Sequence, residues 1–439
     1  MVFALVIFLI TYVLMLAFQK YRPWIALTSA AVFVILGIAG MYDMSLLDAL
    51  GAVDYNVLLM IGGTMGTVTL FVESKMPARL AEILISKVPD VKWAVTSLAL
   101  FAGVISAFVD NVATVLMVAP IGLAISKKLK ISPVPVLIAI AVSSNLQGAA
   151  TLVGDTTSIL LGGYAGMTFL DFFWMLGKPG IFWGVELGAL ASIVVLLYLF
   201  RDENQKVSAK VETEVTDYFP SFLMIATVVL LICASFLQEP ANAGFVTLYN
   251  LRSGLICFAL CIIGVIRACI KKRDIEPVKM VIRDLDKDTL LLLFGIFIVI
   301  EGITKAGVID AVANLFYQVS GDNAFLLYTL IVFASVILSA FIDNIPYVAT
   351  MLPVVSSIAA LMNGGAGMAP YVFYFGLLTG ATLGGNLTPI GASANIAAIG
   401  ILRKNGESVS TRDFLRIGVP FTLAAVLAGY IYIWLVWGM

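Results

Sequence analysis

Ser-Ala-Phe-Val-Asp-Asn at residues 106–111 and Ser-Ala-Phe-Ile-Asp-Asn at residues 339–344 decide the fold of this chain. Each motif places a carboxylate and an amide inside a long apolar stretch, where such groups are costly to bury. A costly feature that occurs twice indicates a duplicated chain. Duplicated halves with hydrophobic segments interrupted at matching places are typical of membrane transporters.

The two halves keep a nearly constant register. One constant offset in numbering pairs Asp110 with Asp343, and after a four-residue insertion the enlarged offset pairs Thr151 with Thr388. Each half is predicted to contain five membrane spans and one hairpin. Because five is an odd number, the second half would lie upside down relative to the first, as an inverted repeat.

The composition indicates a membrane protein. Of the 439 residues, 61% are hydrophobic and 12% are charged, and the mean hydropathy is +1.05, whereas soluble domains carry roughly 25% charged residues. We therefore expect an all-α polytopic membrane protein in a lipid bilayer. The net charge of −1 and the lack of a basic patch interleaved with aromatic residues argue against a nucleic-acid partner.

The chain has no histidine and four cysteines. Proton chemistry must therefore use Asp or Glu, and a histidine-ligated metal site is excluded. The cysteines lie in or at the ends of apolar segments, which predicts neither disulfides nor a metal cluster. Na⁺ or H⁺ is a candidate coupling ion, and no other cofactor is expected.

About ten transmembrane helices and two re-entrant hairpins account for the apolar segments. Repeat 1, residues 1–200, would have three helices, a hairpin, a helix broken in the middle and a last helix. Repeat 2, residues 219–439, would follow the same order, and the polar residues 201–218 would form a cytoplasmic linker. The hairpins, broken helices and last helices are predicted at 95–126, 133–164 and 181–200 and at 323–361, 370–400 and 417–438. The other spans are predicted at roughly 2–18, 24–42, 56–73, 219–237, 253–270 and 288–304.

The basic residues predict which loops face the cytoplasm. With these spans, Lys178, Arg252 and Lys305 fall on one face, and the other 23 of the 26 Lys and Arg residues, including Lys20 and Arg22, fall on the opposite face. The positive-inside rule makes the richer face cytoplasmic. Both termini are then predicted outside, the first hairpin opens from the cytoplasm, and the second opens from the exterior. We expect a prokaryotic plasma membrane.

Interrupted helices supply groups that bind ions. Carbonyl groups freed at a break suit Na⁺, and the positive N-termini of half-helices suit anions. The two hairpin tips and the two mid-span breaks are expected to converge in one substrate or ion site. The candidate side chains in repeat 1 are Asp110, Asn111, Thr114, Asn145, Thr151, Asp155, Thr156 and Thr157. The candidate side chains in repeat 2 are Asp343, Asn344, Asn386, Thr388, Ser393 and Asn395. The glycines expected to let the backbone approach an ion are Gly148, Gly154, Gly384, Gly385 and Gly391.

Helix capping is the alternative explanation for the acidic residues. Asp and Asn are preferred N-caps, so Asp110 and Asp343 could cap the outgoing half-helices, and Asp155 could cap the helix that starts at Thr156. Serine would also cap without placing a charge there, which favours an additional ligand role. The repeat partner of Asp155 is Ala392. Repeat 1 would therefore contribute two carboxylates and repeat 2 one.

These motifs resemble the ion transporter superfamily, in particular the branch of arsenite exporters, NhaD-type sodium/proton antiporters and the melanosomal P protein. The hairpin-tip segment 106–114 is similar to the family signature, the Gly-Asp segment 151–158 is similar to its first unwound helix, and the segment 384–395 is similar to the second. The resemblance covers nearly the whole chain. It implies a scaffold part, a mobile transport part with substrate bound between hairpin tips and unwound helices, and elevator-like motion.

The resemblance has one informative departure. Related dicarboxylate carriers have Ser-Asn-Thr at their hairpin tips, where this chain has Asp-Asn. An acid at the tip favours a cation, a proton or a neutral hydroxide such as arsenite over a carboxylate. No cysteine lies near the four breaks, so thiolate capture of arsenic is not supported there.

The sequence therefore predicts a secondary active transporter coupled to H⁺ or Na⁺, of the arsenite/antimonite efflux or Na⁺/H⁺ antiport type, and not an enzyme. A dicarboxylate- or citrate-like organic anion transporter is the alternative. An intramembrane aspartyl protease would also need two membrane aspartates, but residues 152–155 are Leu-Val-Gly-Asp rather than Gly-x-Gly-Asp. A channel lacks a filter sequence, and a pump lacks an ATP-binding motif. Substrate identity stays open, and a homodimer is expected by analogy alone.

Overall fold

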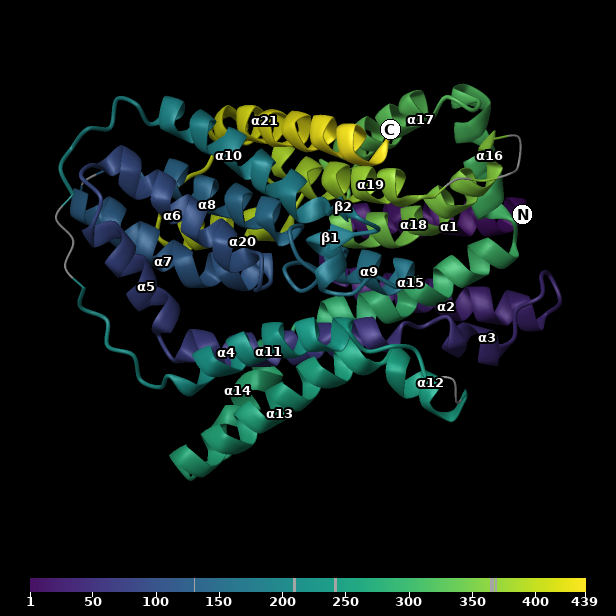
Figure 1. The fold of residues 1–439 in the computed structure, drawn as a ribbon, viewed down its shortest axis with the longest axis horizontal. Coiled ribbons are helices and arrows are strands. Elements are labelled where there is room, and N and C mark those ends of the chain that lie inside the picture. The colour runs from purple at the N-terminus through teal and green to yellow at the C-terminus, as the bar shows by residue number, and fades with distance from the viewer. Residues whose placement is uncertain (130, 208–210, 241–242, 364–366, 368) are drawn as a thin grey trace.

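The computed structural model describes all residues except 130, 208–210, 241–242, 364–366 and 368. The described chain is almost entirely helical, with most helices running along the long axis of the molecule (Figure 1). The prediction of an all-α polytopic protein is confirmed. One small exception is an antiparallel hairpin of β1 (Trp174–Met175) and β2 (Lys178–Pro179). Leu176 and Gly177 both have positive φ, as a tight two-residue turn of this kind requires.

Residues 1–200 contain long helices with short helices between them. They are α1 (Val2–Ala17), η1 (Gln19–Tyr21), α2 (Arg22–Ile38), α3 (Leu46–Gly51), α4 (Tyr55–Glu73), α5 (Met76–Ser86), α6 (Val91–Ser106), α7 (Asn111–Leu129), α8 (Pro133–Gly148), α9 (Thr156–Ala165), η2 (Leu170–Phe172) and α10 (Ile181–Leu199).

The helices of repeat 2 follow the same plan. They are α11 (Phe219–Ser235), α12 (Ala243–Asn250), α13 (Arg252–Lys272), α14 (Glu276–Asp284), α15 (Lys287–Lys305), α16 (Val308–Ser320), α17 (Ala324–Ser339), α18 (Asn344–Leu361), α19 (Tyr371–Gly384), η4 (Gly385–Leu387), α20 (Ser393–Lys404) and α21 (Thr411–Trp437). The offset that pairs Asp110 with Asp343 also pairs the first residues of α6 and α7 with those of α17 and α18. The offset that pairs Thr151 with Thr388 pairs the first residue of α9 with that of α20. The sequence register is therefore also the register of the helices.

The scaffold part interlocks the two repeats. Helix α2 packs against α15, and α13 packs against α4, so each repeat lends a helix to the other. Glycines allow these crossings. A Cβ on Gly63 of α4 would lie 2.4 Å from the backbone carbon of Cys257, and a Cβ on Gly295 of α15 would lie 2.8 Å from that of Ala26. Cys257 and its neighbours in α13 are thus packing residues, and all four cysteines are free.

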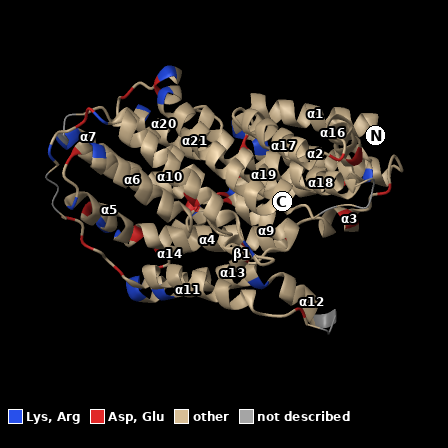
Figure 2. Ribbon diagram, turned by 45° about the horizontal axis from the view of Figure 1, so that its top comes forward, with Lys and Arg blue, Asp and Glu red and all other residues tan. Residues whose placement is uncertain are grey.

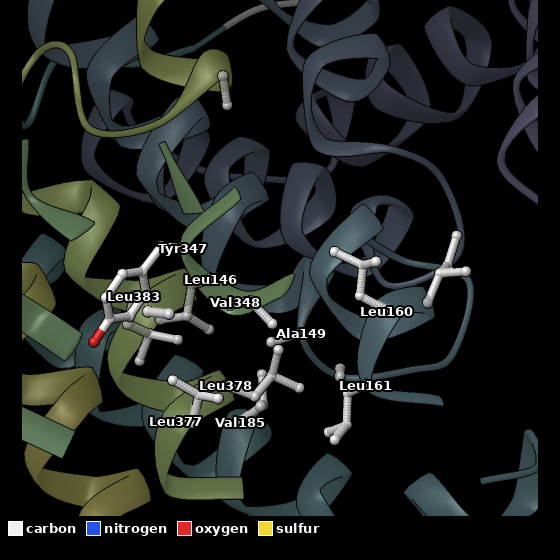
Figure 3. Packing of buried hydrophobic residues seen from close by; sticks show 14 of the residues in the cluster. Leu146, Ala149, Leu160, Leu161, Val185, Tyr347, Val348, Leu377, Leu378 and Leu383 are labelled. Atoms are coloured by element: carbon white, nitrogen blue, oxygen red, sulfur yellow. The ribbon is translucent and has the colours of Figure 1, made fainter. Parts of the chain in front are cut away.

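The two hairpins and the two broken helices, which the resemblance assigns to a transport part, pack on one another. Helix α8 packs against both arms of the α6–α7 hairpin, and α19 packs against both arms of the α17–α18 hairpin. The repeats also exchange contacts here, since α20 lies on α7 and α9 lies on α18. Apolar residues of these helices and of α10 fill the interior (Figure 3). Those labelled there are Leu146, Ala149, Leu160, Leu161, Val185, Tyr347, Val348, Leu377, Leu378 and Leu383.

Basic residues gather at one end of the molecule, which we call the basic end (Figure 2). It is defined by the last turns of α7, α13 and α20, which carry Lys127 and Lys128, Lys271 and Lys272, and Arg403 and Lys404. Both chain termini lie in the other half of the molecule (Figure 1). The sequence likewise predicted both termini on the face opposite to most of the basic residues. Which side of the membrane the basic end faces stays a prediction.

The linker between the repeats is bound to the helices beside it. Residues 201–207 run along the start of α6, where Val91 N donates to Gln205 O, and the linker segment 208–210 lies outside the described residues. At its end, Asp217 pairs with Arg267 Nη1 at 2.6 Å and with Lys271 Nζ at 3.1 Å. Burial alone would raise the pKa of Asp217, but hydrogen bonds from Arg267, Phe219 and Lys271 outweigh it and lower this pKa to about 2.

The structure adds details that the hydrophobic pattern did not give. Helix α7 continues to Leu129, past the predicted end of the first hairpin at 126. Lys127 and Lys128 in its last turn have a high helix propensity, and their positive charges interact favourably with the C-terminal end of the helix. Segments taken as loops contain the short helices α5, α14 and α16. By length and apolar composition alone, seven described helices could cross a membrane, or eight when the bent pair of α15 and α16 counts as one, and α7 and α18 are among the seven. Whether the hairpins are re-entrant stays a prediction.

Candidate functional site

The hairpin-tip aspartates cap the helices that leave the tips. Asp110 Oδ2 accepts hydrogen bonds from the backbone N–H groups of Val112 and Ala113, at 3.0 and 3.1 Å. Asp343 Oδ1 accepts one from Ile345 N at 3.2 Å. Capping is therefore real, but it uses one oxygen of each carboxylate and leaves the other for a further partner.

The first mid-span break carries the third carboxylate. Asp155 caps α9 by accepting from Thr156 N at 2.8 Å, and its other oxygen accepts from Thr157 Oγ1 at 2.8 Å. Thr157 Oγ1 also lies 3.1 Å from Thr382 Oγ1 of α19. Asp155 is buried and lies within electrostatic range of both Asp110 and Asp343. All three carboxylates thus belong to one region of the molecule.

A chain of amides joins the two repeats at this region. Asn111 Nδ2 donates to Asn145 Oδ1 at 2.8 Å, and Asn145 Nδ2 donates to Asn386 Oδ1 at 3.1 Å and to Thr382 O at 2.7 Å. Asn386 Nδ2 in turn donates to Val142 O at 2.8 Å. The three amides are fully or almost fully buried. This network ties a hairpin tip to both mid-span breaks.

Two threonines at matching positions tie each break to a hairpin. Thr151 Oγ1 donates to Ala107 O, and Thr388 Oγ1 donates to Ala340 O. Because both partners keep the repeat register, the twofold relation holds at the level of single hydrogen bonds. Thr114 is buried as well, and its Oγ1 donates to Val109 O at 3.4 Å.

The glycines at the breaks bring backbone against backbone. A Cβ on Gly154 would lie 2.6 Å from Gly148 O and 2.8 Å from the carbonyl oxygens of Ser106 and Ala107. Gly391 has the same surroundings in repeat 2, where its Cβ would meet Gly385 O, Ser339 O and Ala340 O at 2.6 to 2.9 Å. Gly384 instead packs against Val336 of α17. The close approach seen here is to carbonyl groups of the hairpins, and approach to an ion stays a prediction.

Repeat 2 leaves polar atoms without partners. Asn395 Nδ2 donates to Gly385 O and Thr388 O at 3.0 Å, but its Oδ1 is buried and unpaired among the described residues. The same holds for Asn344 Nδ2, next to the tip aspartate. Ser393 Oγ donates to Asp343 Oδ2 at 3.4 Å. Buried polar atoms without partners are costly, and in repeat 1 both amide atoms of Gln147 are likewise buried and unpaired among the described residues.

Arg22 and Thr382 belong to this region although neither was predicted from the sequence, and Arg22 is the charged one. Its Nη1 lies 2.7 Å from Asp343 Oδ2, and the two side chains are 12% and 7% exposed. The sequence placed Arg22 in a loop on the basic face, and the structure instead places it on the second hairpin tip. Arg22 and Asp343 are far apart in the chain and belong to different repeats. A local sequence pattern therefore cannot predict that they form a pair. The available signal was an arginine directly before the apolar span, two residues after Lys20.

Two cavities approach the site from opposite ends. The basic-end cavity, of about 240 Å³, lies between α4, α7 and α14, and Asp110 and Leu116 are among its lining residues. The opposite cavity, of about 320 Å³, lies between α9, α15, α18 and the residues that precede α4, and its lining includes Ala349 and Pro353 but not Asp343. The first cavity therefore reaches its hairpin tip, whereas the second stops short of the other tip. Within the described part of the chain, no group of His, Cys, Asp and Glu could hold a metal ion.

The fold and these cavities define a membrane transporter. Two solved transporter structures share the fold: YdaH of Alcanivorax borkumensis, with a TM-score of 0.59, 14% identity and coverage of 96% of this chain and 98% of that one, and MtrF of Neisseria gonorrhoeae, with a TM-score of 0.59, 15% identity and coverage of 92% and 84%. The chain belongs to the CitMHS family, whose model, described as citrate transporter, matches residues 6–377.

Relatives in sequence agree with this assignment. An uncharacterized transporter of Mycobacterium tuberculosis is 32% identical over 441 residues, covering 99% of this chain and 98% of its own. The mouse P protein is 26% identical and covers 87% of this chain and 54% of its own length. The resemblance to the ion transporter superfamily and its P-protein branch is thus confirmed, and the chain is a transporter and not an enzyme, which excludes the protease alternative.

Proposed function

We propose that this protein is a secondary active transporter that couples a small ion or solute to H⁺ or Na⁺. The observation that carries the proposal is the buried Asn111–Asn145–Asn386 network, which joins the first hairpin tip to both mid-span breaks, the elements that carry Asp110 and Asp155. Asp343 at the second tip is tied to the second break through Ser393. Three carboxylates and one arginine leave the site with an excess of negative charge. Such a site attracts a cation or a proton, and binding of either relieves the repulsion among the carboxylates.

Alternating access is supported by the division into two parts. The hairpins and broken helices pack mainly on one another, while α2, α4, α13 and α15 interlock as a scaffold. Cavities at both ends border the surface between the parts. An elevator-like movement of the transport part along α4 and α15 would open one cavity to the site and close the other.

Na⁺ as the coupling ion is supported by carbonyl groups that converge at each break. The oxygens of residues 106, 107 and 148 surround Gly154, and those of residues 339, 340 and 385 surround Gly391. Na⁺ favours uncharged oxygen ligands at broken helices. H⁺ as the coupling ion is supported by the carboxylates themselves.

Arsenite or antimonite efflux and Na⁺/H⁺ antiport fit an acidic site best, because none of these needs a bound carboxylate. A citrate-like anion is the second candidate. It is favoured by the description of the family, by the Arg22 guanidinium at the second tip, and by the unpaired amide group of Asn344. Such an anion would require that a cation binds with it, to offset the carboxylates.

Ligand-dependent melting of the purified protein tests the proposal. A carried ligand should raise the melting temperature in proportion to its saturation, and Na⁺, Li⁺, arsenite, antimonite and citrate can be compared across pH. Asp155→Asn should abolish the rise. Asp48→Asn, which alters an exposed cap in α3, should preserve it.

Flux into proteoliposomes under an imposed Na⁺ or pH gradient then identifies the coupling ion. The wild type should accumulate the ligand that raises its melting temperature only while one of these gradients persists. Accumulation that is unchanged after both gradients are dissipated would overturn secondary active transport.

A further inference from the structure

Arg22 and Arg252 begin equivalent helices of the two repeats, although the offset that pairs Asp110 with Asp343 would match Arg22 to Leu255, three residues beyond Arg252. Each is the first residue of a scaffold helix, α2 or α13, and each of these helices crosses a glycine-bearing helix of the other repeat. Asp343 and Asp110 are likewise matched at the two hairpin tips. In a twofold molecule the start of α13 would lie at the first hairpin tip as the start of α2 lies at the second, and Arg252 is the basic residue at that helix start.

The structure forms only one of these two ion pairs. Arg22 holds Asp343 at 2.7 Å. Arg252 Nη1 instead donates to Tyr249 O at 2.8 Å, and its guanidinium lies 3.9 Å from the centre of the Tyr249 ring. Among the described residues, neither Arg252 nor Asp110 forms an ion pair. The two repeats therefore differ at their hairpin tips: the second tip is paired with an arginine, and the first is not.

The helix registers explain why the second pair is absent. Gly254 N donates to Asn56 Oδ1 at 2.8 Å, so Arg252 lies near the first turn of α4, away from the basic end. The cavity that contains Asp110 is lined by α4 between Met65 and Glu73. At 1.5 Å per residue, roughly 15–20 Å along α4 separate the two levels.

Arg22 lies at the other level. Ala26 contacts Gly295, and Phe33 contacts Gly302, so α2 runs in step with α15 and Arg22 lies near its first turns. Helix α15 begins beside the basic-end cavity, which includes its cap Asp286. Both hairpin tips are therefore displaced toward the basic end, where Arg22 is available and Arg252 is not.

Exposure at matched positions agrees with this displacement. Leu116 of α7 is 55% exposed and lines the basic-end cavity. Its repeat partner, Ala349 of α18, is 4% exposed at the opposite cavity. Helix α18 contacts α15 of the scaffold directly beside the opposite cavity, while the basic-end cavity lies between the first hairpin and α4.

We propose that Arg22 and Arg252 are alternating counter-cations of the hairpin tips, an inference that rests on the proposed transport function. In the conformation described here, Arg22 neutralises Asp343 while Asp110 stays open to its cavity. When the transport part moves away from the basic end, Asp343 leaves Arg22 and Asp110 reaches Arg252. One acidic tip is then always paired with protein, and the other is free for a transported or coupling cation.

Single-cysteine reporters at Leu116→Cys and Ala349→Cys test this exchange in liposomes. Cys233→Ala and Cys269→Ala remove the more accessible native thiols, since Cys257 and Cys261 are buried. With Arg22→Gln, maleimide labelling at 116 should slow and labelling at 349 should accelerate, changing the ratio of the two rates by about tenfold or more. Arg252→Gln should change the ratio in the opposite direction.

Conservative and partner variants separate pairing from structural damage. Arg22→Lys and Arg252→Lys should keep the wild-type ratio, because the charge is retained. Asp343→Asn should reproduce Arg22→Gln, and it keeps the test valid if loss of Arg22 prevents folding. A ratio that moves in the same direction with both glutamine variants, or does not move, would overturn the proposal. Reciprocal shifts without coupled flux would uphold the exchange and overturn only the proposed function.

Discussion

At the scale of single residues, each aspartate of the site performs two tasks. One oxygen caps a half-helix, while the other meets Arg22, Thr157 or a cavity. Capping fixes the position of the carboxylate at the helix start. The second oxygen is then available for an ion pair, a hydrogen bond or a ligand. The two explanations that the sequence left open are therefore compatible.

Asn145 is the residue on which the link between the repeats depends most. Asn145→Ala would leave Asn111 Nδ2 and Asn386 Oδ1 buried without their partner, at a cost of about 1–3 kcal/mol for each unsatisfied group. The melting temperature of the purified protein should fall by several degrees. Asn314→Ala, which removes an exposed amide bonded to Asp310 O, is the matched control and should change it little.

The residues of the candidate site differ in how readily they can be identified from the sequence. Asp110, Asn111, Asn145, Asn386 and the threonines were predictable, because a polar group that interrupts an apolar segment stands out. Arg22 was not, since its role arises from a partner in the other repeat. The sequence also could not predict that the two hairpin tips have different surroundings. The offset between the repeats is the same in every conformation, so it carries no information about which tip is paired.

At the scale of elements, the hydrophobic pattern predicted the long helices and the places where they break. It missed α5, α14 and α16, because short amphipathic helices at the ends of spans lack the long apolar run that marks a span. These helices pack on α7, α4 and α18, so their formation depends on tertiary contacts. The extent of α7 was underestimated because Lys127 and Lys128 of its last turn lie beyond the apolar run.

The crossing of α4 and α13 offers a matched pair of substitutions. Gly63→Ala would place a Cβ 2.4 Å from the backbone of Cys257, whereas Gly62 has no atom within 4 Å of its would-be Cβ. Overpacking should cost Gly63→Ala about 1–3 kcal/mol, and Gly62→Ala should be neutral or slightly stabilising because alanine favours a helix. Melting temperatures of the two variants, measured side by side, check this. Equal effects would contradict the assigned crossing.

At the scale of the whole molecule, the inverted repeat gives the protein two ends and one site. Each repeat lends a scaffold helix to the other, and the candidate site draws residues from both repeats. The constant offset between the two tip motifs predicted this relation, and the helices keep it. The offset could not predict that both hairpin tips lie toward the basic end. The same sequence permits a second arrangement, in which the tips lie toward the opposite end.

Flux by aspartate variants in proteoliposomes tests the central claim most directly, namely that both repeats contribute carboxylates to one transport site. Asp110→Asn and Asp343→Asn, each checked for wild-type elution and insertion, are compared with the wild type and with Asp48→Asn. Coupled flux should fall to the background of protein-free liposomes in both tip variants and stay unchanged in Asp48→Asn. Wild-type flux in both tip variants would contradict the account.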